Sequence, residues 1–99
     1  MKYTFKNYIV CKIINTDNVS VTEYIEIYKV ISTMYNSFIR ILKVCTYNMN
    51  SGSISFRVSD IDSLENIDYI NNSLIFQGDS FEECYEHLNF LKDANKYNI

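Results

Sequence analysis

The chain has 99 residues, of which 47% are hydrophobic and 21% are charged, as expected for one small globular domain spanning residues 1–99. This composition excludes the disordered, collagenous and low-complexity classes of protein. The net charge of -3 and a sequence pI near 5.0 argue against a phosphate-rich partner. No run approaches the roughly 18 apolar residues of a membrane span, and residues 1–7 lack the apolar core of a signal peptide, so we expect a cytoplasmic protein with no membrane partner.

The cysteine content agrees with that expectation. Cys11, Cys45 and Cys84 are an odd number of thiols with no close pair in the sequence. A disulfide framework of the kind found in small secreted proteins is therefore not expected, and we predict reduced thiols.

The charges are distributed unevenly along the chain. Residues 1–58 carry seven of the nine Lys and Arg residues, whereas residues 59–99 carry nine of the twelve Asp and Glu residues. An acidic half of this kind can attract a basic protein surface, although acidic residues also gather at helix N-termini for local reasons. The candidate partner-binding residues are Asp60, Asp62, Glu65, Asp68, Glu82, Glu83 and Glu86.

The first predicted element is a strand within residues 3–14. Ile9, Cys11 and Ile13 share one face of it, while Tyr8, Val10 and Ile14 mostly fill the other face. A strand that is apolar on both faces is typical of a central position in a sheet. A turn is predicted at residues 16–18.

Residues 20–42 are predicted to form one helix of about six turns. Ser20 and Glu23 have the spacing of a capping box, and apolar residues recur behind them at steps of three and four. The alternative is a strand over Tyr24–Tyr28, because the segment is rich in β-branched and aromatic residues.

A second apolar row on this predicted helix suggests an interface. The row consists of Ile27, Val30, Met34 and Ile41. Burying four such side chains favours association, so the row predicts a homodimer or partner contact, unless a neighbouring helix of the same chain covers it.

The remaining elements are a hairpin, a short helix, a strand and a final helix. The hairpin joins strands at residues 44–49 and 54–58, with Phe56 predicted to face the core and Ser55 and Arg57 to face solvent. A short helix is expected over residues 62–70, a strand at 74–76, and a helix from about residue 79 to 93. The apolar stripe of that last helix is formed by Phe81, Cys84, Tyr85, Leu88 and Leu91. The order β-α-β-β-α-β-α predicts an α+β fold in which helices cover one face of a small antiparallel sheet, and a ferredoxin-like plait in particular.

The chain offers few groups for chemistry. Cys84 and His87 are three residues apart on the predicted final helix, a spacing that would suit a zinc site or a Cys-His pair. However, Cys11 and Cys45 stand alone inside predicted strands, where a buried cysteine acts as a small hydrophobic residue. The acidic run from Asp60 to Asp68 lacks the EF-hand glycine, and Gly52 and Gly78 are too far apart for a phosphate-binding loop. We therefore predict no metal, no cofactor and no catalytic residue.

The sequence thus favours a non-enzymatic protein-binding module. Its abundance of Ile, Asn, Tyr, Lys and Asp is typical of AT-rich genomes, including those of phages and large DNA viruses. Small acidic proteins of this type suggest an inhibitor that blocks a basic nuclease or toxin by occlusion, of the anti-defence or immunity kind. One alternative is an enzyme built on Cys84 and His87. The other is a nucleic-acid-binding plait that uses Lys2, Lys6, Lys12, Arg40, Lys43 and Arg57.

Overall fold

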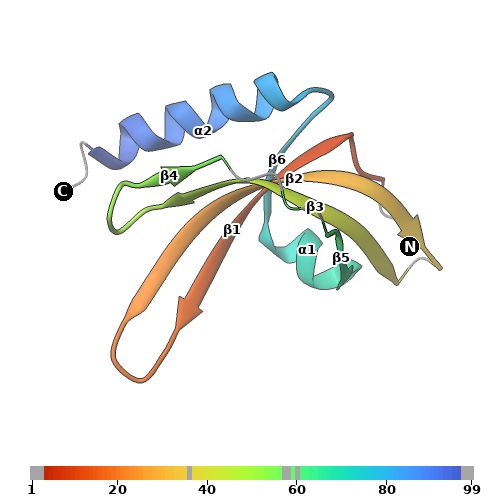
Figure 1. Ribbon diagram of the computed structural model, residues 1–99, viewed down its shortest axis with the longest axis horizontal. Helices are drawn as coiled ribbons and strands as arrows, with labels where there is room; N and C mark the ends of the chain where they lie inside the picture. The colour runs from red at the N-terminus through yellow and green to blue at the C-terminus, as the bar shows by residue number, and fades with distance from the viewer. Residues whose placement is uncertain (1–3, 36, 57–58, 60, 97–99) are drawn as a thin grey trace.

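The computed structural model describes residues 4–35, 37–56, 59 and 61–96, which form one antiparallel sheet and two helices (Figure 1). In chain order the elements are β1 (Tyr8–Thr16), β2 (Val21–Met34), β3 (Phe38–Asn48), β4 (Ile54–Ser55), β5 (Ser63–Asn66), α1 (Ile67–Ser73), β6 (Leu74–Gly78) and α2 (Phe81–Lys96).

The sheet is a meander extended by the last strand. Its order is β4-β3-β2-β1-β6, and β5 pairs with the part of β3 that β4 does not reach. The predicted α+β class is therefore confirmed. The strand order differs from that of the ferredoxin-like plait, because β2 occupies the place expected for the first helix.

The predicted central position of the first strand is confirmed, although Ile14 near its end is 58% exposed. β1 lies between β2 and β6, and Ile9, Val10 and Cys11 are all fully buried. Ile9 and Cys11 belong to one hydrophobic cluster, and Val10 belongs to another on the opposite side of the sheet. β1 is apolar on both faces because it is a central strand with a hydrophobic cluster on each side of it.

The predicted helix over residues 20–42 is wrong. The segment forms β2 and the start of β3, and the alternative reading of Tyr24–Tyr28 as a strand is correct. Apolar residues at steps of three and four predicted a helix, but in a strand the same residues fall on both faces. Both faces of this sheet are covered by a hydrophobic cluster, so apolar residues are suitable on either face. β-Branched and aromatic residues favour the extended conformation once neighbouring strands supply the hydrogen bonds. The Ser20–Glu23 capping box is replaced by a turn in which Asp17 accepts hydrogen bonds from the amides of Val19 and Ser20.

The two helices lie on opposite faces of the sheet (Figure 1), whereas the sequence predicted helices on one face. The core beneath α1, called here the α1-side core, contains Ile9, Cys11, Tyr28, Ile39, Ile41, Ile67 and Ile70. The core beneath α2, the α2-side core, contains Val10, Ile25, Ile27, Cys45, Tyr47, Cys84 and Leu88. The three long strands β1, β2 and β3 therefore each contribute residues to two separate cores.

The predicted interface row is dispersed by this arrangement. Ile27 is buried in the α2-side core, and Ile41 is buried in the α1-side core. Val30 packs against the α1-side core, and Met34 is partly buried at the end of β2. Val30 and Ile41 lie opposite each other on the α1 side, whereas Ile27 faces the α2-side core, so the four residues do not form one exposed row.

Two local predictions between residues 54 and 70 also need correction. The predicted hairpin forms between β3 and β4, but β4 comprises only Ile54–Ser55, and Phe56 is 59% exposed instead of facing the core. Arg57 lies outside the described residues. The segment predicted to open a helix at residue 62 is strand β5, and α1 begins later, where the Asn66 side chain accepts hydrogen bonds from the amides of Asp68 and Tyr69. Asparagine is a strong N-cap, so it sets this start.

The final helix and strand agree with the sequence. β6 contains the predicted strand at 74–76, and the predicted stripe of α2 packs in or against the α2-side core. At its start, the Ser80 hydroxyl accepts a hydrogen bond from the Glu83 amide, and the Glu83 carboxylate accepts one from the Asp79 amide. These two contacts cap the start of α2. Within the described part of the chain, neither helix is long and apolar enough to cross a membrane.

Candidate functional site

Glu26 is a buried carboxylate in the middle of the sheet. It lies on β2 between Cys11 of β1 and Thr46 of β3, and only 7% of the residue is exposed. Neighbouring positions on this face of β1 and β2 carry apolar or aromatic side chains, so the carboxylate interrupts an otherwise apolar surface.

Three donors compensate the buried charge. The Tyr28 hydroxyl donates to Glu26 Oε1 at 2.7 Å, and the Thr46 hydroxyl donates to Oε2 at 2.9 Å. Lys43 Nζ lies 3.0 Å from the same Oε2 atom. Burying a carboxylate without such partners would cost several kcal/mol, so the three donors offset the hydration that Glu26 loses at this position.

A β-bulge between β2 and β3 positions Lys43. Ile27 is opposite Cys45 but Tyr28 is opposite Lys43, which leaves Val44 as the extra residue. Without the bulge, strict alternation would direct Lys43 away from Glu26. Bulges re-aim side chains in this way, often beside functional sites.

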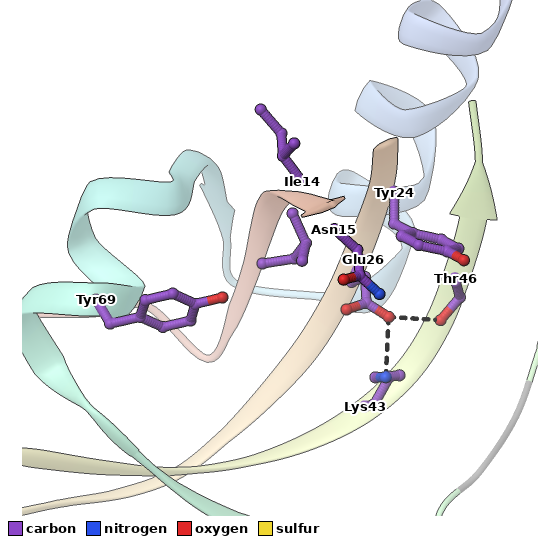
Figure 2. Close-up of a pocket in the computed structure, with 8 residues that line it drawn as sticks. Ile14, Asn15, Tyr24, Glu26, Lys43, Thr46 and Tyr69 are labelled. Carbon is purple, nitrogen blue, oxygen red and sulfur yellow. Dashed lines mark hydrogen bonds and ion pairs between the residues drawn. The ribbon is translucent and has the colours of Figure 1, made fainter. Parts of the chain in front are cut away.

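The carboxylate borders a cavity of about 530 Å³ on the α1 side of the sheet, beyond the area that α1 covers. We call it the Glu26 cavity. Figure 2 shows Tyr69 reaching towards it from α1, with Tyr24 and Thr46 on the other side of Glu26. Its lining residues are Ile13, Ile14, Asn15, Tyr24, Glu26, Lys43, Thr46 and Tyr69.

Burial and the Glu26 charge also affect neighbouring acids. Burial, followed by the charge of Glu26, raises the pKa of the Cys11 thiol to about 12. The same two causes raise the pKa of Tyr28 well above its usual value. Both groups are therefore protonated at neutral pH, and the Tyr28 hydroxyl remains a hydrogen-bond donor to Glu26.

A second hollow lies on the opposite side of the sheet, beside the start of α2. This aromatic pocket has a volume of about 250 Å³ and is lined by Tyr8, Val44, Phe56 and Phe81. The Tyr8 and Phe81 rings meet edge to face at 6.3 Å. The Tyr85 ring lies between the other two rings, with its centroid 5.7 Å from that of Phe81 and 5.3 Å from that of Phe56. Because of the bulge, the adjacent residues Val44 and Lys43 lie on different faces of the sheet. Val44 lines the aromatic pocket and Lys43 lines the Glu26 cavity.

The predicted acidic residues fall into two groups on opposite faces. Glu82, Glu83 and Glu86 are exposed on α2, next in sequence to the Phe81 and Tyr85 rings of the aromatic pocket. Asp62, Glu65 and Asp68 lie at or near β5 and α1. Asp62 pairs with Arg40 at 3.5 Å, and Glu65 borders the groove beside the Glu26 cavity. Asp60 lies outside the described residues.

The three cysteines lie buried as free thiols. Burial raises the pKa of Cys45 and of Cys84 to about 11, so neither is a nucleophilic thiolate at neutral pH. His87 stacks on Phe76 with ring centroids 4.3 Å apart. Among the described residues, no group of three or more His, Cys, Asp or Glu side chains is placed to hold a metal ion.

Three of the four described basic residues considered for nucleic-acid binding are paired with acids. Lys12 lies 4.0 Å from Glu23, Arg40 lies 3.5 Å from Asp62, and Lys43 pairs with Glu26. Lys6 is exposed, and Lys2 and Arg57 lie outside the described residues. Of these six residues, the structure describes Lys6, Lys12, Arg40 and Lys43, and the last three each face an acidic partner.

Sequence reasoning missed Glu26 as a site residue because it placed this residue on a helix, where an exposed glutamate is unremarkable. The signal was present in Tyr24–Tyr28. In a strand, Glu26 shares its face with Tyr24 and Tyr28, and a charged residue in a central strand must find partners. Lys43 had no comparable signal, because its orientation depends on the bulge.

Comparisons with known protein families, with curated proteins and with solved structures gave no significant match.

Proposed function

We propose that this protein is a non-enzymatic protein-binding module that inhibits a partner by occluding it, and that the partner docks beside the start of α2. The observation that carries this function is the open aromatic pocket adjoining a row of exposed acids. Phe56 presents more than half of its surface to solvent although its ring contacts Tyr85.

The pocket has the chemistry of a protein interface anchor. Aromatic side chains supply large contact areas and are enriched at the energetic centres of protein interfaces. A partner side chain entering the pocket would cover Phe56 and Phe81, both of which retain exposed apolar surface. Burial of that surface favours association by the hydrophobic effect.

The neighbouring charges favour a basic partner. Glu82 and Glu86 are one helical turn apart on α2 and exposed, and Asp79 is exposed just before the helix. Acidic groups around an apolar pocket increase the association rate with a basic surface and select against acidic partners. A basic nuclease or toxin meets these requirements, as in inhibitors of the anti-defence or toxin-immunity type. A cytoplasmic location agrees with the three free thiols.

The test is affinity capture on the immobilised protein, using a lysate of the organism that makes it and a displayed random-peptide library. We expect the selected peptides to combine an apolar residue with Lys or Arg. Binding should fall at least tenfold for Phe56→Ala and for Glu82→Lys/Glu86→Lys, and should weaken as salt increases. Any captured enzyme should lose activity with the wild type and keep it with these variants.

A matched control is available on the same helix. Asp93 is exposed twelve residues after Phe81, about 18 Å along the helix axis. Asp93→Lys changes the net charge in the same direction and should leave binding intact. Equal binding by all variants would refute the proposed surface. Retention on single-stranded nucleic acid at physiological salt would favour the nucleic-acid alternative instead.

A further inference from the structure

We infer that the Glu26 cavity is a binding site for a small zwitterionic molecule of the amino-acid type. The site lies on the α1 side of the sheet, so this inference is independent of the protein-binding surface beside α2.

Fold stability alone does not require the Glu26–Lys43 pair. A buried carboxylate paired with an ammonium group is often no more stabilising than apolar residues of similar size, because the carboxylate loses its hydration. Here the Glu26 side chain is 9% exposed, whereas the Lys43 side chain is 47% exposed. The neighbouring positions of the α1-side core, such as Cys11 and Ile41, are apolar and would continue across this part of the sheet. Instead, the chain places a carboxylate there and uses a bulge to bring an ammonium group to it.

The pair also borders a cavity of suitable size. Its volume of about 530 Å³ is in the range of small-molecule sites, which run from about 300 to 1,000 Å³. The aliphatic side chain of Ile13 and the rings of Tyr24 and Tyr69 supply apolar walls. The polar groups lie together, around Glu26 (Figure 2).

The ion pair retains hydrogen-bonding capacity of both kinds. A carboxylate has about four acceptor positions, and the contacts from Tyr28, Thr46 and Lys43 use three of them. The Lys43 ammonium group has three donors, and its contact with Glu26 uses one. Lys43 is 47% exposed in its side chain, so its head group can also turn towards a ligand.

Charge complementarity then selects the ligand. A simple cation would be attracted to Glu26 but repelled by Lys43. A simple anion would be attracted to Lys43 but repelled by Glu26. A zwitterion satisfies both, with its ammonium group on Glu26 and its carboxylate on Lys43. The side chain of such a ligand would pack against the aliphatic and aromatic walls.

The experiment is a titration of the full-length protein with a panel of free L-amino acids, followed by calorimetry and by NMR chemical shifts. Methyl esters of the same amino acids keep only the positive charge, and N-acetyl derivatives keep only the negative charge. We expect one or more free amino acids to bind and to shift the signals of Glu26, Lys43, Thr46 and Tyr69. Both blocked derivatives should bind at least tenfold more weakly.

Variants of the pair provide the second part of the test. Glu26→Gln and Lys43→Met should each weaken amino-acid binding at least tenfold. Lys12→Met is the matched control, because Lys12 forms a more distant ion pair with Glu23 and does not line the cavity. It should leave binding unchanged. If Glu26→Gln fails to fold, Lys43→Met and the blocked derivatives still decide the outcome.

Several results would overturn the inference. They are the absence of binding at millimolar amino acid, equal binding of a blocked derivative, or an equal loss of binding in Lys12→Met. Shifts confined to residues outside the cavity would have the same consequence.

Discussion

Tyr28 and Glu26 extend from the same face of β2, and the Tyr28 hydroxyl donates a hydrogen bond of 2.7 Å to Glu26 Oε1. Both residues are buried, so the bond replaces contacts with water that folding removes. Hydrogen bonds to charged groups contribute more to stability than those between neutral groups.

Tyr28→Phe should therefore destabilise the protein. It deletes only the hydroxyl donor, and the expected loss is about 1.5–3 kcal/mol in the free energy of unfolding. Urea denaturation measures it. Tyr35→Phe is the control, since Tyr35 is 88% exposed and should change stability very little. Equal effects of the two substitutions would show that the Glu26 contact adds nothing.

The assignment of residues 21–34 to a central strand has its own test. Ile27 is fully buried on β2 in the α2-side core, whereas Val19 in the preceding turn is 94% exposed. Ile27→Ala should cost about 2–5 kcal/mol because it leaves a cavity in that core. Val19→Ala should be nearly neutral. A loss well below 2 kcal/mol for Ile27→Ala would instead agree with the predicted helix over residues 20–42, on which Ile27 belongs to an exposed row.

The buried thiols predict a loss of stability in alkali. The pKa values of Cys11, Cys45 and Cys84 rise from 9.0 to about 12, 11 and 11 in the folded chain. Between pH 9 and these values the unfolded chain loses thiol protons that the folded chain keeps. Stability is therefore retained below pH 9 and falls as pH rises above it, by up to about 1.4 kcal/mol per pH unit for each thiol.

Denaturation curves from pH 8 to 10.5 measure this effect, and Cys11→Ala should reduce the slope. A thiol reagent provides an independent measurement at pH 8. Native protein should react slowly and only through unfolding, while protein in denaturant should react at once at three sites. Rapid reaction of a native thiol would contradict the burial of all three.

The two glycines should respond differently to alanine. A Cβ at Gly78 would lie 3.0 Å from the Glu83 Cβ and 3.1 Å from the Cys84 Sγ, both in the first turn of α2. Gly78→Ala should cost about 1–3 kcal/mol and increase amide exchange at residues 79–84.

Gly52 has a φ of +79° and nothing within 4 Å of an added Cβ. Gly52→Ala should cost about 1–2 kcal/mol through backbone strain and leave α2 unchanged. Equal exchange at the start of α2 in both variants would refute the crowding at Gly78.

Parts of the fold followed directly from the sequence. The apolar pattern of residues 8–14 predicted a central strand, the glycine, serine and asparagine residues around 50–53 predicted a hairpin, and the stripe from Phe81 to Leu91 predicted α2. In each case the local pattern and the tertiary environment agree, so a local reading was sufficient.

Residues 20–42 show where the local pattern was insufficient. Their apolar spacing fits a helix with one wide apolar face and equally fits strands buried on both faces. The choice depends on β1 and on the later part of β3, which supply the hydrogen bonds, and on two helices that cover both faces. These are long-range contacts, which no window of neighbouring residues contains.

The sequence by itself determined the first strand, the last helix and three unpaired thiols, because each depends on composition or on periodicity within one segment. It also indicated the α+β class, although the helix predicted over residues 20–42 was wrong. Only the tertiary structure decided that Glu26, Tyr28, Lys43 and Thr46 meet on one face and that Phe56 joins Phe81 on the other. Both sites are assembled across strands whose register includes a bulge at Val44. One extra residue there reverses which face a side chain occupies, and that register is set by the pairing of distant segments.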